Sequence, residues 1–383
     1  MTKSFDYDVI VVGAGPAGAT AARILSQKGY GVLILDRKAF PRPKLCAGLI
    51  TWKTLNVLFD VFGIDCEALK SKAIIHYQSR QYAIWNRYGE MVRGRLDFPF
   101  HMVDRQIYDQ FWLDLAHQAG AEVRTGHGVV KIEPDNSSVI TDSGECLRAR
   151  VILGADGVLS RVRSSLLKTG RIRPNRIEGL AFAIQGFVSR QQFQGFADWP
   201  VIYFGFIPWG YAWSFPGPKK QIVGICGLQK KVGPHFRDYF EIFIKRLRIP
   251  VNKISKLRGH PLPYGNFLRQ PGCRNVLLLG DAAGLVDPLL GEGIYYAHKS
   301  GQIAAAAVLK AHPDWDIALE YYARYLNQTL IRNLRHIRIY RNIIFSLLHW
   351  GNYRSMGFFI KRSQKAIEEA IQGRRSFDRL ILP

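Results

Sequence analysis

The sequence predicts an α/β fold in which a parallel-sheet domain is interrupted twice by a mostly antiparallel β domain and followed by a helical extension. Two observations predict this arrangement. Apolar runs that end in glycine and aspartate occur at three widely separated places, and aromatic-rich runs with strand-like alternation separate them. The expected division is 1–75, 104–176 and 269–313 for the parallel-sheet domain, 76–103 and 177–268 for the β domain, and 314–383 for the extension.

The first glycine-rich turn follows an apolar run at residues 8–12 that is typical of a buried parallel strand. Gly13 permits a tight turn, Gly15 lets the backbone approach a pyrophosphate, and Gly18 lets the following helix pack against the strand. Each glycine therefore has its own physical reason to be at its position. Together they predict the phosphate-binding turn of a Rossmann-like domain.

A helix is predicted over residues 16–27, beginning with Pro16 and Ala17. Its N-terminal amides would point at the phosphates, and its dipole favours negative charge there. Asp36 closes the second apolar run about 20 residues past the glycines, where a carboxylate can accept hydrogen bonds from ribose hydroxyls. The pattern indicates a bound dinucleotide, but it does not by itself separate NAD from FAD.

Two later stretches repeat the same pattern. A mid-chain run leads to Asp156 and Gly157, and a late run leads to Gly280 and Asp281. The mid-chain pair forms a strand–turn–helix junction, which either supports the nucleotide-binding domain or contacts the nucleotide. Asp281 either accepts a hydrogen bond from a cofactor hydroxyl or is a plain helix N-cap.

A further glycine-rich turn contains Gly291 and Gly293 and is followed by Ile294 and a helix predicted over 295–309. Backbone amides at such a helix start stabilise negative charge. Glycine also lets a flat ring lie directly against the backbone. The turn therefore suits the edge of a flat ring that carries negative charge, and the alternative is an ordinary glycine-rich turn.

An aromatic row lies in the β domain. Tyr211, Trp213 and Phe215 alternate with smaller residues, so on a strand they share one face, and Pro216 then stops the strand. Such a row lines a tunnel for an apolar chain or forms the core face of a sheet. The residues alone favour the sheet core.

Composition and charge narrow the function classes. The chain has 383 residues, of which 48% are hydrophobic and 22% charged, as in ordinary globular proteins. Its 53 basic and 30 acidic residues give a net charge of +23, and such a field attracts nucleic acid or anionic lipid. No nucleic-acid module is legible, so no nucleic-acid partner is expected and an anionic membrane surface is favoured. Neither a GxSxG motif nor a P-loop supports a hydrolase or an NTPase.

The cysteines and histidines do not predict a metal site. Five scattered cysteines form no CxxC pair, and the histidines lack ligand spacing, so neither a disulfide framework nor a metal centre is expected. No stretch approaches the roughly 18 apolar residues that span a bilayer. We therefore expect a cytoplasmic protein, either free or peripheral on the inner membrane face.

The helical extension carries a basic amphipathic pattern. Between residues 331 and 365 arginines and lysines alternate with apolar and aromatic residues, and no acidic residue occurs. This pattern suits the lipid interface. It suits equally well a helix that packs on the body of the protein and exposes a charged face.

The three strand–glycine–aspartate stretches resemble those of the FAD-dependent aromatic-hydroxylase superfamily. Two more stretches, PRPKLCAG at 41–48 and YAWSFP at 211–216, resemble signatures of its geranylgeranyl reductase family. Arg105, followed by an amphipathic helix, resembles an arginine of the superfamily that contacts FAD. The resemblance implies FAD as the cofactor, bound by Gly13, Gly15, Pro16, Ala17, Gly18, Asp36, Arg37, Lys44, Cys46, Ala47, Gly48, Arg105, Val130, Asp156, Gly157, Gly280, Asp281, Gly291, Gly293 and Ile294.

The resemblance also implies an activity. It indicates a reductase that saturates carbon–carbon double bonds of a polyprenyl lipid, a chlorophyll precursor or a quinone side chain, with NAD(P)H or ferredoxin as electron donor. Cys46 is then a candidate proton donor beside the flavin, and a cysteine that merely packs is the alternative. The candidate substrate-binding residues are Tyr211, Trp213, Phe215 and Pro216.

Two other functions stay open at this point. The first is an aromatic monooxygenase or related flavin oxidoreductase on the same fold. The stretches around Cys46 and Tyr211 favour the reductase over this alternative. The second is a flavin-bound membrane-surface protein without turnover, which the positive charge and the extension favour.

Overall fold

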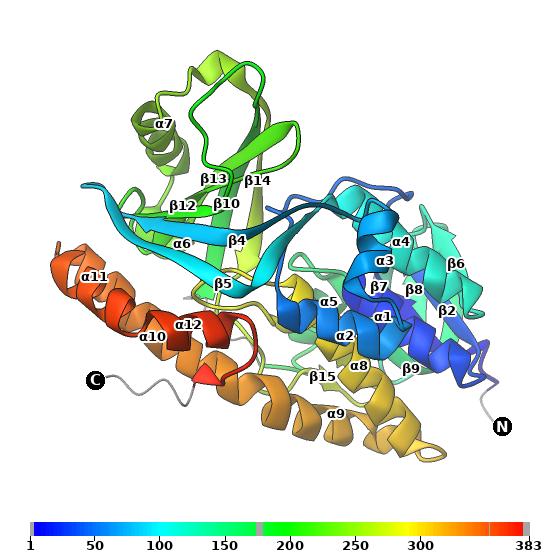
Figure 1. Ribbon diagram of the computed structural model, residues 1–383. Coiled ribbons are helices and arrows are strands. Elements are labelled where there is room, and N and C mark those ends of the chain that lie inside the picture. Colours follow the sequence, from blue (N-terminus) through cyan, green and yellow to red (C-terminus); the bar gives the residue numbers. More distant parts are fainter. Residues whose placement is uncertain (1–3, 174–178, 352, 378–383) are drawn as a thin grey trace.

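The computed structural model describes residues 4–173, 179–351 and 353–377 (Figure 1). A largely parallel sheet has the strand order β15-β16-β9-β1-β2-β6, and β8 extends it by pairing with β9 and β7. The strands of this first sheet are β1 Tyr7–Val12, β2 Val32–Asp36, β6 Glu122–Thr125, β7 Val129–Glu133, β8 Ser138–Thr141, β9 Cys146–Gly154, β15 Gly272–Cys273 and β16 Val276–Leu278.

Strand β1 lies at the centre of this sheet. It pairs in parallel with β2 on one side and β9 on the other, and β16 runs parallel beside β9. Val9, Ile10 and Val11 have no exposed surface, as expected for a strand covered on both faces. Because β1, β2, β9 and β16 run the same way, their carboxyl ends and the turns that follow them share one edge of the sheet.

Helices cover the first sheet. Helix α1 contacts both α4 and α8. The approach to α8 is close, because a Cβ added at Gly301 would lie 2.4 Å from the carbonyl oxygen of Ala17. The helices of this part are α1 Pro16–Gln27, α2 Trp52–Phe62, α3 Cys66–Ser71, α4 Arg105–Gln118, α5 Arg161–Lys168 and α8 Ile294–Ala311, with the short 3₁₀ turn η3 at Gly280–Ala283.

The second sheet is largely antiparallel and has the order β14-β10-β13-β12-β11-β4-β5-β3, with β4 and β11 parallel. Phe240 and Phe243 of α7 pack in one buried cluster with Val223 and Ile225 of β13. The elements of this part are β3 Leu49–Ile50, β4 Ile75–Trp85, β5 Glu90–Val103, β10 Leu180–Ser189, β11 Val201–Phe204, β12 Gly210–Phe215, β13 Lys220–Leu228, α6 Gln229–Val232, α7 Phe236–Arg246, η2 Val251–Lys253 and β14 Ile254–Pro263.

Helices α10 to α12 run along the second sheet on the side away from α7, whereas α9 packs against α8 and β16 of the first part (Figure 1). Phe345 and Met356 are buried in one cluster with Phe204 and Tyr211 of that sheet. The apolar side of the extension therefore packs on the body, as one of its two predicted arrangements requires. These elements are η4 Trp315–Ile317, α9 Ala318–Leu326, the π-helical η5 Asn327–Ile331, α10 Arg332–His349, α11 Tyr353–Arg362 and α12 Gln364–Ile371.

The predicted fold class is confirmed, and helix α1 has the predicted bounds. Strand β3 pairs with β5 in the second sheet although it lies within the segment 1–75 that was assigned to the first domain. The domain boundaries stay a prediction, and the one at 176/177 lies outside the described residues. Within the described residues, no helix is both long and apolar enough to cross a membrane.

Candidate functional site

A cavity of about 720 Å³ lies where the carboxyl edge of the first sheet meets the second sheet. Two predicted site residues, Gly18 and Pro216, do not line it. The predicted residues that line it are Gly13, Gly15, Pro16, Ala17, Asp36, Arg37, Lys44, Cys46, Ala47, Gly48, Arg105, Val130, Asp156, Gly157, Tyr211, Trp213, Phe215, Gly280, Asp281, Gly291, Gly293 and Ile294.

The turn after β1 is held by close backbone packing. Gly13 has φ +109°, and a Cβ there would lie 2.4 Å from the carbonyl oxygen of Ala155. A Cβ at Gly18 would lie 2.0 Å from the carbonyl oxygen of Gly13, so Gly18 acts by packing beneath the turn. The N–H of Ala14 donates to Asp36 Oδ2 at 2.9 Å, which fixes the Asp36 carboxylate beside the turn.

Asp156 lies after β9 and has one free oxygen. Its Oδ2 accepts hydrogen bonds from the N–H groups of Arg161 at 2.7 Å and Val162 at 3.3 Å. Its Oδ1 is buried and has no partner among the described residues. Burial raises the pKa of Asp156. A buried acceptor without a donor costs free energy, and a small movement of Asp156 that opens Oδ1 to the cavity would let a bound ligand donate to it.

Arg105 begins α4 and is fixed by a buried carboxylate. Its guanidinium donates to Asp109 Oδ1 at 2.7 Å and Oδ2 at 2.9 Å, and Arg42 lies 3.5 Å from Asp109 Oδ2. Burial alone would lower the pKa of Arg105, but the Asp109 carboxylate outweighs burial and the pKa is raised. Arg105 therefore presents a permanent positive charge to the cavity, in a geometry set by Asp109.

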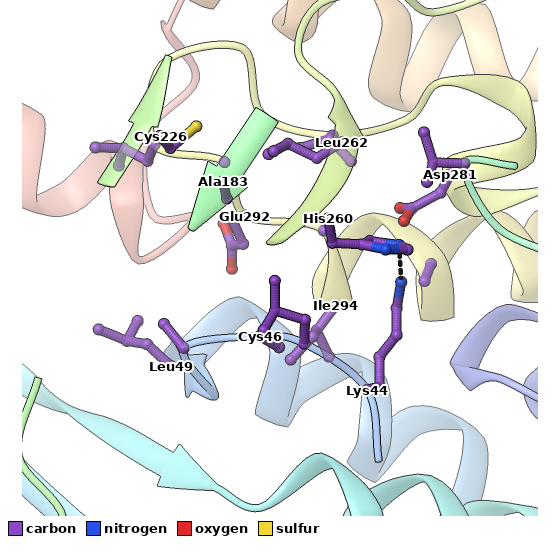
Figure 2. A pocket seen from close by; sticks show the side chains of 18 of the residues that line it. Lys44, Cys46, Leu49, Ala183, Cys226, His260, Leu262, Asp281, Glu292 and Ile294 are labelled. Carbon is purple, nitrogen blue, oxygen red and sulfur yellow. Dashed lines mark hydrogen bonds between the residues drawn. The ribbon is translucent and has the colours of Figure 1, made fainter. Parts of the chain in front are cut away.

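The segment that carries Cys46 crosses the middle of the cavity (Figure 2). Its backbone is fixed by Gln185 of β10, whose Nε2 donates to the carbonyl oxygen of Cys46 at 3.1 Å. The N–H of Gly48 approaches Cys46 Sγ at 3.3 Å. Gly48 has φ +73°, and a Cβ there would lie 2.2 Å from the carbonyl oxygen of Val103, so glycine is required.

Lys44 reaches across the cavity to His260 of β14, and Figure 2 shows this contact. The two nitrogens, Nζ and Nε2, are 2.9 Å apart. Burial and, to a smaller extent, the charges of Lys44 and Arg37 lower the pKa of His260 to about 4, so His260 is neutral and accepts from Lys44. Burial also lowers the pKa of Lys44, although Asp281 opposes this.

The turn before α8 rests on a buried ion pair. Lys53 Nζ lies 2.5 Å from Glu292 Oε2, and the Thr51 hydroxyl donates to Oε1 at 2.9 Å. Gly291 has φ +72°, which brings the turn close to Tyr211. Because α8 begins at Ile294, its free N-terminal amides lie at the cavity beside this turn.

An apolar arm of the cavity extends between the second sheet and the C-terminal helices. Tyr211, Trp213 and Phe215 lie on β12 and line it, and Trp213 Nε1 is buried without a partner among the described residues. Helices α10 to α12 close the other side. Their lining residues include Tyr340, Ile344, Phe359, Ile360, Ile367 and Ile371.

Sequence reasoning missed several residues of this cavity. Gln185, His260, Glu292 and the lining residues of α10 to α12 were not predicted. Only Glu292 carried a usable signal, because it lies inside the predicted glycine-rich turn. Among the described residues, no group of three or more His, Cys, Asp or Glu side chains is placed to hold a metal ion.

The cavity fits FAD. The glycine turn after β1 leaves the backbone open to the cavity, and Arg105 and Lys44 supply positive charge for phosphates. Residues 6–181 match the family model described as an FAD binding domain. Fold and site together define an FAD-dependent oxidoreductase.

The relatives narrow this class. The chain is 31% identical to a digeranylgeranylglycerophospholipid reductase of Methanosarcina acetivorans, over 82% of this chain and 78% of that protein. It is 32% identical to a geranylgeranyl diphosphate reductase of Rhodobacter capsulatus, over 79% of this chain and 75% of that protein. The crystal structure of a geranylgeranyl bacteriochlorophyll reductase-like protein of Thermoplasma acidophilum superposes on this chain with a TM-score of 0.78 at 21% identity. The match covers 89% of this chain and 88% of that chain. The chain belongs to the geranylgeranyl reductase family.

Proposed function

We propose that the protein reduces carbon–carbon double bonds of a polyprenyl chain carried by a lipid, a chlorophyll precursor or a quinone. The apolar arm carries this proposal, because it opens directly off the cofactor-binding edge and is lined by aromatic and aliphatic side chains. A long hydrocarbon chain would be held there by burial of apolar surface. Reduced FAD, when bound, would supply the hydride for one alkene carbon.

The protein's own residues would bind the cofactor and deliver the proton. In this proposal Arg105 and Lys44 neutralise the pyrophosphate, and Asp156 accepts a hydrogen bond from the cofactor. The Cys46 thiol donates a proton to the second alkene carbon, so that one C–H bond forms as the S–H bond breaks. The positive charge of Arg105 then stabilises the thiolate that is left.

Replacing Cys46 by alanine tests the proton donor. We expect kcat for alkene reduction to fall about 100-fold, since a positioned general acid contributes on this order. Flavin content and photoreduction of the flavin should be unchanged. Stopped-flow reoxidation of the reduced flavin by a prenyl substrate measures the effect.

Cys226→Ala is the matched control, because Cys226 lines the same cavity on β13 and burial raises the pKa of its thiol to about 12. This variant should keep the wild-type rate. Equal rates in Cys46→Ala and Cys226→Ala would show that Cys46 only packs.

The activity itself is tested by lipid mass spectrometry after anaerobic photoreduction of the holoenzyme with geranylgeranyl lipids. We expect a gain of two hydrogens for each double bond reduced. A gain of oxygen instead would identify a monooxygenase, the alternative on this fold. Vesicle binding without substrate-dependent reoxidation of the flavin would favour a non-catalytic membrane-surface protein.

We propose NAD(P)H or ferredoxin as the electron donor. The net charge of +23 favours an acidic protein partner such as ferredoxin, because complementary charge speeds association. Anaerobic bleaching of the flavin with NADH, NADPH or reduced ferredoxin distinguishes the donors. If only reduced ferredoxin bleaches the flavin, and the rate of bleaching falls as salt is added, ferredoxin is the electron donor.

We further propose that α10 and α11 dock on an anionic membrane surface at the inner face of the membrane. Trp350, directly after α10, is 78% exposed, and Phe358 of α11 is 68% exposed. Exposed Arg335, Arg354 and Lys361 accompany them. Aromatic and basic side chains together suit a lipid interface.

The double variant Trp350→Ser/Phe358→Ser tests this docking. We expect at least about a 10-fold loss of affinity for phosphatidylglycerol vesicles, since each large side chain contributes roughly 1.5–3 kcal/mol when buried. Sedimentation with vesicles measures it. The control Val251→Ser removes an exposed apolar residue elsewhere and should not change binding. Unchanged binding of the double variant would contradict the proposed face.

A further inference from the structure

The apolar arm contains one carboxylate. Glu368 of α12 lines the cavity and is only 7% exposed. Polar and apolar side chains line the cavity together with it. The polar ones are Tyr82, Ser363 and Gln364, and the apolar ones on β5, α11 and α12 are Leu96, Phe100, Phe359, Ile367 and Ile371. A buried carboxylate is costly unless it is hydrogen-bonded or paired.

Only one oxygen of Glu368 is used by the protein. Oε1 accepts hydrogen bonds from the Tyr82 hydroxyl at 2.7 Å and from Gln364 Nε2 at 3.0 Å. Oε2 has no hydrogen-bond partner among the described residues, and it is not one of the fully buried unpaired atoms, so it keeps surface open to the cavity.

No cation neutralises this carboxylate. None of the ion pairs between described residues includes Glu368. The nearby cations Lys365 and Arg374 each lie 2.8 Å from Asp97 on the surface. Glu368 therefore presents a hydrogen-bond acceptor, and not an ion pair, to the cavity.

The carboxylate lies well away from the cofactor-binding edge. Leu49 of β3 follows the Cys46 segment and lies opposite Met102 of β5 in the sheet. Met102 in turn lies opposite Tyr77 of β4. Tyr82, which donates to Glu368, is five residues further along β4, which corresponds to roughly 17 Å of strand. Glu368 thus faces a part of the substrate remote from the reacting bond.

We propose that Glu368 is a specificity-determining residue that accepts a hydrogen bond from a hydroxyl group at one end of the prenyl substrate. This inference rests on the proposed reduction of prenyl chains and adds the chemical class of the substrate's end group. A hydroxyl satisfies Oε2, whereas a hydrocarbon end leaves it buried and unpaired. A phosphate is repelled, because its charge has the same sign. The hydroxyl belongs either to a free prenyl alcohol or to the head group of a prenyl glycerol lipid.

Reduced holoenzyme is tested with geranylgeraniol, geranylgeranyl glycerol ether, geranylgeranyl diphosphate and a hydrocarbon that has the same double bonds. We expect the wild type to prefer the alcohol or the glycerol ether, and the better of the two identifies the source of the hydroxyl. In Glu368→Leu, KM for the preferred hydroxyl substrate should rise about 10-fold or more, while KM for the hydrocarbon should fall, because no unpaired carboxylate oxygen is left in the arm.

The variant Glu368→Gln separates charge from hydrogen bonding. It removes the negative charge and keeps hydrogen bonding. With the amide oxygen accepting from Tyr82 and Gln364, the amide nitrogen faces the cavity and donates to the oxygen of the substrate hydroxyl. Use of the hydroxyl substrate should therefore be largely rescued, and use of the diphosphate should improve. Glu369→Gln, on the solvent side of α12 where Glu369 pairs with Arg375, is the matched control and should alter neither. Flavin content and the unfolding temperature confirm that each variant is folded.

The outcomes separate this inference from the function on which it rests. If the wild type reduces none of the four compounds, the proposed function fails. If it reduces them but Glu368→Leu leaves the preference between hydroxyl and hydrocarbon substrates unchanged, only the inference about Glu368 fails. A wild-type preference for the diphosphate would also overturn the inference.

Discussion

Gly13→Ala is expected to yield a protein that does not retain FAD. Gly13 has φ +109°, and an added Cβ would lie within 3.0 Å of three backbone atoms of Ala155 and Asp156. The strained conformation costs about 1–3 kcal/mol, and the backbone contacts force the turn out of the cavity. We expect FAD affinity to fall at least about 100-fold. Flavin absorbance per protein after incubation with excess FAD measures the effect.

Gly120→Ala separates backbone strain from the clash. Gly120 has φ +104° at the end of α4, nearly the same as Gly13, but an added Cβ meets nothing within 4 Å. This control should lose some stability and keep its flavin. Full flavin content in Gly13→Ala would contradict the assignment of this turn to the cofactor.

The cofactor-binding edge could be predicted because its signals are local. Gly13, Asp36 and Asp281 each follow an apolar strand, and parallel strands bring their carboxyl ends to one edge whatever the lengths of the connections. Their meeting at one cavity follows from fold class alone. The start of helix α1 could be predicted for the same reason, because the glycine turn sets it.

The other parts of the site depend on contacts between distant residues. Lys44 and His260 are 216 positions apart, and nothing near either residue indicates the other. Gln185 lies 139 positions from Cys46, on a strand whose pattern predicts only a sheet. Such pairings are set by the order of strands in the second sheet, which hydrophobic periodicity does not determine.

The surface that the C-terminal helices cover could not be predicted from their sequence either. An amphipathic helix needs an apolar surface to cover, and its sequence does not say whether that surface is a membrane or the protein. Here Phe345 and Met356 cover the second sheet, and Trp350 and Phe358 remain exposed on the outside. The inner face of these helices thus packs on the protein and closes the apolar arm, and the outer face is the one that we propose for membrane docking.

The second large effect is expected at Asp109. Asn at this position keeps the shape of the side chain but leaves the buried Arg105 without its counter-charge. Arg105 cannot become neutral by losing its proton, since the pKa of a guanidinium is too high. We expect the free energy of unfolding of the protein freed of FAD to fall by about 3–5 kcal/mol, as when one partner of a buried pair is removed. Urea unfolding followed by circular dichroism measures the change.

Two further variants test the physical reason. Glu90→Gln removes the partner of Arg93 in a pair at the surface, and it should cost less than about 1 kcal/mol. Arg105→Met/Asp109→Leu removes both fully buried charges and should recover most of the stability. Arg42 also loses Asp109 as a partner, but its side chain is 16% exposed and can meet water. The double variant should nevertheless bind FAD weakly, since the positive charge that faces the cavity is gone. Tight FAD binding by this stable double variant would mean that Arg105 serves the fold and not the cofactor.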